Sequence, residues 1–197
     1  FLAPVLNNTY WAQIIYNGED KNENGILDEG EDLAIDANKD GIIDPPNGKL
    51  DRYIVPEPPA APSVFIDPDD KKVTVYWNNI SEQTFDPISG RQDFEGYRVY
   101  SNLKTMNDTV MTIGGQTLLR EFDIRDSIGF DLGLESIRFD TVINGETYHY
   151  RFIDSLLTNG WPERAFYAVT AYDQGDPAAN LPSLESSINE TKTYVYP

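Results

Sequence analysis

Oxygen-bearing side chains recur at a fixed spacing in two short stretches near the N-terminus, residues 20–31 and 36–47. When each stretch is numbered from its first residue, an Asp or Asn stands at positions 1, 3, 5 and 9, and a glycine stands at position 6. Carboxylate, amide and carbonyl oxygens are the ligands that calcium takes, and the glycine permits the sharp turn between them. The spacing therefore predicts that both stretches bind a hard divalent cation.

The first stretch matches this pattern at every ligand position. Its oxygen donors would be the side chains of Asp20, Asn22, Asn24, Asp28 and Glu31, together with the backbone carbonyl of Ile26 at position 7. Glu31 stands where a bidentate carboxylate completes the oxygen shell of such a loop. The alternative is an acidic Asn/Gly-rich turn that binds no metal.

The second stretch fits the pattern up to position 9. Its donors would be the side chains of Asp36, Asn38, Asp40 and Asp44, with the carbonyl of Ile42. Position 12 holds Asn47, whose amide supplies a single oxygen, so we expect Asp51 to complete this site. The alternative is again a turn without metal. Together the two loops predict about two calcium ions per chain.

Charge and composition limit the partners. The chain has 197 residues and a formal net charge of −18, which argues against binding to nucleic acid or to anionic membranes. Eleven acids and three lysines lie in residues 17–51, a segment that would repel itself without a bound cation. No apolar run approaches the roughly 20 residues that span a bilayer. The absence of cysteine leaves calcium to take the stabilising role of disulfides in an extracellular protein.

The chain divides into four zones: an apolar N-terminal strand segment (1–16), the tandem loops (17–54), a proline-rich linker (55–62) and a β-rich domain (63–197). Alternating apolar residues predict strands at 72–78, 94–101, 164–173 and 188–196, and a hairpin of 138–143 and 146–152 around Asn144-Gly145. Residues 102–135 read as an insertion that holds a short strand near 116–122 and at most a helical turn at 126–136. Trp77 is expected in the core.

The tandem loops resemble the type 3 repeats of thrombospondins and related bacterial calcium-repeat linkers, and more distantly the EF-hand-like loops of dockerins. Only residues 32–35 separate the two loops, too few for the helices that flank each loop of an EF-hand. The resemblance covers residues 20–51. It implies a compact rod of ions wrapped by chain, in which neighbouring sites share side chains.

Residues 59–197 resemble a fibronectin type III domain, an all-β, immunoglobulin-like sandwich. The resemblance rests on residues 73–77 (VTVYW), 94–100 (FEGYRVY) and 167–173 (YAVTAYD). It departs from the family at the corner tyrosine, because Ala165 stands at the expected spacing and Tyr167 follows two residues later. The family implies a scaffold or adhesive module without catalysis.

Residues suited to catalysis are scarce. His149 is the sole histidine and lies on an expected strand, there is no cysteine, and no Gly-x-Ser-x-Gly elbow occurs. Acids are so abundant that no pair stands out as a glycosidase dyad. We therefore expect no enzymatic activity. Trp11 and Trp161 could stack on sugar rings if they are exposed.

These features predict a secreted, calcium-stabilised structural or adhesive module at the cell surface, without nucleic-acid binding or membrane insertion. Residues 1–16 would add as a strand to a neighbouring subunit and build a filament or layer, or would cover their own sandwich. The alternative is a non-catalytic, polysaccharide-binding accessory module of a larger secreted enzyme. The initial Phe1, without a visible signal peptide, suggests a processed product or a piece of a longer protein.

Overall fold

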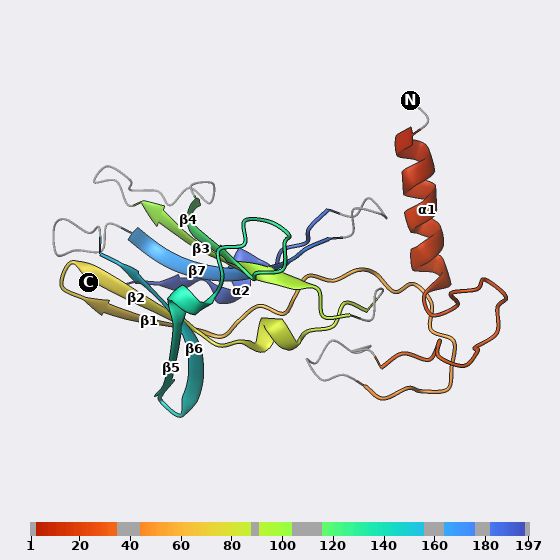
Figure 1. Cartoon of the computed structure of the whole chain (residues 1–197), viewed down its shortest axis with the longest axis horizontal. Helices are drawn as coiled ribbons and strands as arrows, with labels where there is room; N and C mark the ends of the chain where they lie inside the picture. The colour runs from red at the N-terminus through yellow and green to blue at the C-terminus, as the bar shows by residue number, and fades with distance from the viewer. Residues whose placement is uncertain are drawn as a thin grey trace. The chain divides into compact units, whose positions relative to one another are not determined.

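The computed structural model describes residues 3–34, 44–87, 91–103, 116–155, 164–175 and 182–195 (Figure 1). The chain forms two compact units. The first contains Phe1–Glu57, Phe85–Gln92 and Pro177–Leu181, and the second contains Pro58–Thr84, Asp93–Asp176 and Pro182–Pro197. The tandem loops fall in the first unit. Most of the β-rich segment falls in the second, but residues 85–92 and 177–181 of that segment belong to the first.

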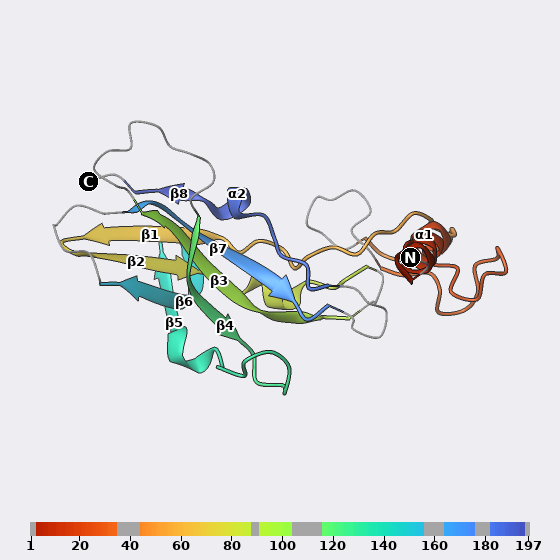
Figure 2. The same ribbon diagram turned by 90° about the horizontal axis from the view of Figure 1, so that it is seen from above.

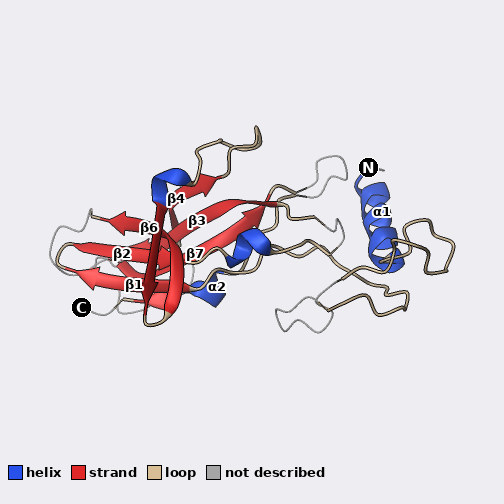
Figure 3. Ribbon diagram, turned by 60° about the horizontal axis from the view of Figure 1, so that its bottom comes forward, coloured by secondary structure: helices blue, strands red, loops and turns tan. Residues whose placement is uncertain are grey.

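Within its described residues, the second unit consists of two antiparallel four-stranded sheets (Figures 2 and 3). One sheet has the order β1-β2-β6-β5, formed by Val64–Asp69, Lys72–Trp77, Glu146–Asp154 and Arg138–Ile143. The other has the order β4-β3-β7-β8, formed by Thr117–Asp123, Phe94–Leu103, Arg164–Asp173 and Thr193–Tyr194. This arrangement confirms the expected all-β sandwich.

The core lies between the sheets, and alternate residues of the central strands fill it. Val73, Val75 and Trp77 point inward from β2, and Tyr97 and Val99 point inward from β3. Trp77 is fully buried, and its ring centroid lies 5.7 Å from that of Tyr97 in an edge-to-face arrangement. The period-2 alternation of the sequence therefore identified the buried face of both strands.

The hairpin between β5 and β6 also follows the prediction. Ile143 pairs with Glu146, so that Asn144 and Gly145 form a two-residue loop. Both loop residues have positive φ, 54° and 87°, as a type I′ turn requires. An Asn-Gly pair tolerates these angles with little strain, and for this reason the turn could be read from the sequence.

The N-terminal segment differs from the prediction, because Ala3–Asn17 forms a helix, α1, and not a strand. Pro4 stands in the first helical turn, where its missing N–H has no intrahelical partner to lose. Gly18 ends the helix with φ 57°, and its N–H donates to the carbonyl of Ile14 over 2.9 Å. The expected assembly through an added strand of residues 1–16 therefore has no basis in this fold.

Three further segments depart from the sequence prediction. The expected strand at 188–196 is instead a short helix, α2 (Ile188–Thr191), capped by Ser187, followed by β8, which is only two residues long. β1 was not anticipated, because Pro68 interrupts its pattern. β4 pairs with β3 along its length, so this part of the expected insertion belongs to the sandwich. Two 3₁₀ helices also occur in this unit, η1 (Ile80–Gln83) and η2 (Glu135–Ile137), and η2 overlaps only the end of the helical turn expected at 126–136.

Candidate metal centre in the first acidic loop

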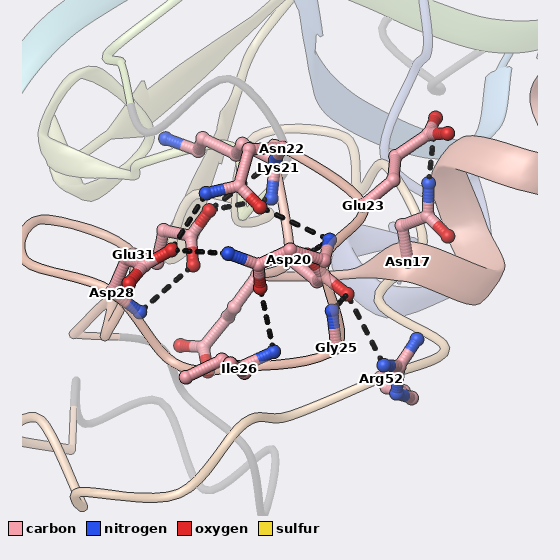
Figure 4. Close-up of polar contacts among 12 residues, drawn as sticks. Asn17, Asp20, Lys21, Asn22, Glu23, Gly25, Ile26, Asp28, Glu31 and Arg52 are labelled. Carbon is pink, nitrogen blue, oxygen red and sulfur yellow. Dashed lines mark hydrogen bonds and ion pairs between the residues drawn. The ribbon is translucent and has the colours of Figure 1, made fainter.

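The first acidic loop, residues 20–31, folds back on the carboxylate of its first residue (Figure 4). Asp20 accepts hydrogen bonds from the N–H groups of Asn24 and Gly25 over 3.0 and 2.8 Å. Gly25 has φ 77°, a conformation that favours glycine and that closes the turn. Asp20 is buried, with 2% of its surface exposed, because the loop wraps around it.

The side chains at positions 3 and 5 converge on the side chain at position 9. The amide groups of Asn22 and Asn24 each donate to one oxygen of Asp28 over 2.7 Å. These two hydrogen bonds, the one from Asn22 first, lower the pKa of Asp28 below its ordinary value, because they stabilise the charged carboxylate. The amide oxygens accept in turn from the N–H groups of Asn24 and Ile26.

Glu31, at position 12, reaches back over the start of the loop. One oxygen of its carboxylate accepts from the N–H groups of Lys21 and Asn22 over 3.0 and 3.3 Å, and the other accepts from the N–H of Asp28 over 3.0 Å. Glu31 is buried. The structure therefore brings Asn22 and Asn24 to Asp28, whereas Asp20 and Glu31 contact backbone N–H groups of the same loop. The apolar side chain of Ile26 is exposed.

Two charged residues that the sequence did not single out complete this region. Glu19 is fully buried, and its carboxylate accepts from the N–H groups of Leu33 and Asp51 over 2.7 and 2.9 Å. Arg52 places a guanidinium nitrogen 3.2 Å from a carboxylate oxygen of Asp20. No signal marked Glu19 among eleven acids, and contacts to residues 51 and 52 depend on a chain reversal that local patterns do not encode.

The second predicted site is described only in part. Asp36, Asn38, Asp40 and Ile42 lie outside the described residues. Asp44 is half-buried, and the amide of Asn47 donates to the carboxylate of Asp51 over 2.6 Å. Asp32, directly after the first loop, accepts from the N–H groups of Asn47 and Gly48 and so ties the first loop to residues 47 and 48. Asn47 and Asp51 therefore lie close together, and their role as ligands stays a prediction.

The donor set of the first loop fits a hard cation in its chemistry. Every candidate ligand atom is a carboxylate, amide or carbonyl oxygen, which calcium prefers. Among the described residues, no three His, Cys, Asp or Glu side chains lie close enough together to hold a metal ion. The carboxylates of the loop accept backbone and amide N–H groups instead, so ion binding here would draw on the amide and carbonyl oxygens as well.

Other candidate residues lie elsewhere. His149 contacts Asp140, with 2.7 Å between its Nδ1 atom and a carboxylate oxygen, on the β5–β6 hairpin. Trp11 lies on α1, half-buried, with its ring edge-to-face against Tyr10. Trp161 is outside the described residues. In the described part of the chain, no helix has both the length and the apolar character needed to cross a bilayer.

Comparison of the chain with family models, with curated proteins and with solved structures gives no match.

Proposed function

We propose that this chain is an extracellular structural or adhesive module in which calcium stabilises the loop segment, residues 17–54. The observation that carries the proposal is that Asn22 and Asn24 converge on Asp28 within one loop, which Asp20 and Glu31 close through backbone N–H groups. The oxygen donors at these five positions have the spacing of a calcium-binding loop. Calcium sites of this kind suit the concentration outside cells, about 1 mM.

The charge of the loop segment supports the same conclusion. Eleven acids and three lysines in residues 17–51 repel one another, and Arg52 adds one cation beside Asp20. A bound divalent cation would neutralise part of this charge and would lower the free energy of the folded segment relative to its unfolded state. Ion binding and folding of the segment are then coupled, so removal of the ion should loosen residues 17–54 first.

The β-sandwich supports a structural role. If its strands are lettered in chain order, with β4 as C′, the sheets read A-B-E-D and C′-C-F-G, an immunoglobulin-like order with one added strand. Tyr167 on β7 donates its buried hydroxyl to the side chain of Asp154 at the end of β6 over 2.8 Å, whereas the corner tyrosine of such domains bonds to the backbone. The strand order favours the fibronectin type III-like assignment, and with it a scaffold that presents surfaces to extracellular partners.

Calorimetric titration of the full chain with Ca²⁺ tests the proposal. We expect Glu31→Gln to weaken binding at the first loop, because it removes the carboxylate that closes the loop. Glu29→Gln is the matched control, since it removes the same charge from an exposed position that is not a ligand in the pattern. A titration without heat, or equal binding by the two variants, would contradict the proposal.

Limited proteolysis of the same protein locates the effect. With calcium, residues 17–54 should resist cleavage, and with EDTA they should be cut before the sandwich, because burial of apolar side chains holds the sandwich together without an ion. Cleavage of the sandwich first, or equal resistance with and without calcium, would count against calcium as the stabilising ligand of this segment.

A further inference from the structure

A second buried acidic position lies in the sandwich, outside the loops considered so far. Glu95 is a bulge residue of β3, because the pairing with β7 shifts between Phe94, opposite Asp173, and Gly96, opposite Tyr172. A bulge turns a side chain away from the regular alternation of its strand. The carbonyl of Glu95 accepts from the N–H of Ile124, which fixes the bulge against the end of β4.

The carboxylate of Glu95 is buried without a partner. Only 3% of the surface of Glu95 is exposed, and neither carboxylate oxygen has a hydrogen-bond partner among the described residues. A buried ionised carboxylate without hydrogen bonds or a counter-charge is strongly unfavourable. Either a proton or a cation must therefore accompany this side chain in the folded protein.

Asp123, the last residue of β4, is a second buried acid at this position. It is fully buried, and its carboxylate accepts from the backbone N–H groups of Phe130, Asp131 and Leu132. The loop that follows β4, residues 124–133, is thus folded around Asp123 in the way that the first acidic loop is folded around Asp20.

Gly129 shows that the two carboxylates face the same place. A Cβ atom built on Gly129 would lie 2.8 Å from the nearer oxygen of Asp123 and 3.0 Å from one oxygen of Glu95. Carboxylate oxygens from two strands therefore both lie next to Gly129. Gly129 has φ 66°, so both its conformation and its lack of a side chain suit this position.

We propose that Glu95 and Asp123 hold a calcium ion at this bulge, beneath residues 124–133. Two carboxylates from separate strands supply the charge, and oxygens of the covering loop would complete the shell, since calcium accepts backbone carbonyls. No three His, Cys, Asp or Glu side chains of the described residues lie close enough together to hold a metal ion, and a site of two carboxylates with loop oxygens does not require three. Burial, and then the charges of Asp126, Asp123 and Asp131, raise the pKa of Glu95 to about 7, which agrees with an unneutralised site in the metal-free protein.

Hydrogen–deuterium exchange of the full chain, followed by mass spectrometry with Ca²⁺ or EDTA, tests this site separately from the first loop. In the wild type, Ca²⁺ should slow exchange in peptides covering residues 124–133. Glu95→Gln should abolish this slowing. It should also weaken Ca²⁺ binding at this site by at least about 10-fold, because loss of even a supporting group beside a metal costs that much. Glu31→Gln should leave the slowing intact, so the failure of one site is distinguishable from the failure of the other.

The matched control is Glu135→Gln, which removes the same charge from an exposed residue near the loop. It should retain the response to Ca²⁺. Asp123→Asn is the second variant, because its amide oxygen can still accept from the loop while one ligand charge is lost, and it too should lose the response. The proposal is overturned if Ca²⁺ does not change the exchange rate of residues 124–133 in the wild type. It is also overturned if the response to Ca²⁺ persists in Glu95→Gln. The first result would mean that a proton, and not a cation, accompanies Glu95.

Discussion

Two buried glutamates show how differently the two regions accommodate negative charge. Glu31, in the acidic loop, accepts three backbone N–H groups, whereas Glu95, in the sandwich, accepts none from the described residues. The loop has little apolar surface and is shaped by its own carboxylates, so loss of charge balance would unfold it. The sandwich is shaped by its apolar core, and an unbalanced acid there would disturb only the loop above it. Calcium would therefore have a global effect on the first region and a local effect on the second.

Loss of the core tryptophan should be the largest effect on the sandwich. Trp77→Ala removes a fully buried ring that contacts Tyr97 and Tyr150, and we expect it to lower the free energy of unfolding by about 3–5 kcal/mol. Urea denaturation followed by circular dichroism measures this change. Val142→Ala, at an exposed site of β5, should stay within about 0.5 kcal/mol of the wild type. A small effect of Trp77→Ala would mean that the core does not dominate the stability of this unit.

The stability of the acidic loop should depend on Glu19, with a smaller effect than that of Trp77 on the sandwich. Glu19→Gln leaves a single oxygen for the N–H groups of Leu33 and Asp51, and a lost hydrogen bond to a buried group costs about 1–3 kcal/mol. Amide exchange in residues 19–34 measures the free energy of local opening. Glu29→Gln, at an exposed position, should leave it unchanged. Equal opening of both variants would show that the contacts of Glu19 do not hold the segment.

The stability of the metal-free sandwich should fall as pH rises. The pKa of Glu95 is raised to about 7, so between its ordinary value of 4.5 and about 7 the folded protein binds more protons than the unfolded protein. The free energy of unfolding in EDTA should decrease across this window, and the decrease should be absent in Glu95→Gln. Thermal unfolding at several pH values measures the difference. A wild-type profile that matches Glu95→Gln would mean that Glu95 does not carry the proton.

The smallest effect is expected on the β5–β6 hairpin. The pKa of Asp140 is lowered by its hydrogen bond to His149 and next by that to Arg138. His149→Gln should raise the pKa of Asp140 towards its ordinary value, which carboxyl NMR can follow. It should leave the unfolding curve unchanged, because Asp140 is exposed. A marked loss of stability would show that the sole histidine has a larger structural role than its position indicates.

The strands of the sandwich could be predicted where their causes are local. Val73, Val75 and Trp77 alternate with more polar neighbours, and Asn144-Gly145 encodes its turn, so β2 and the hairpin followed from the sequence. The helix α1 did not, because its apolar residues show no clear face. Its end signals, Pro4 and Gly18, were the available evidence for a helix.

The candidate sites divide in the same way. Ligand spacing within residues 20–31 is a local property, and the structure folds these residues into one hydrogen-bonded loop. The partnership of Glu19 with Asp51 joins residues 32 positions apart, and no local pattern encodes it. Glu95 lies between Phe94 and Gly96 and reads as an ordinary strand residue. Its burial depends on a bulge that only the pairing of strands reveals.

The contacts of Gly18, Glu19 and Asp20 with residues 51 and 52 hold the two ends of the loop segment together. We call this set of contacts the neck. A Cβ atom on Gly18 would collide with the carbonyl of Asp51, the backbone of Glu19 pairs with that carbonyl, and Asp20 meets Arg52. The chain between residues 20 and 51 starts and ends at this neck, so its length can change without changing the neck contacts. Each doubling of such a loop costs only about 0.6 kcal/mol in closure entropy. Insertion of a further acidic loop between residues 34 and 44 should therefore leave the neck closed. The segment could grow by duplication without any change in the contacts at its ends.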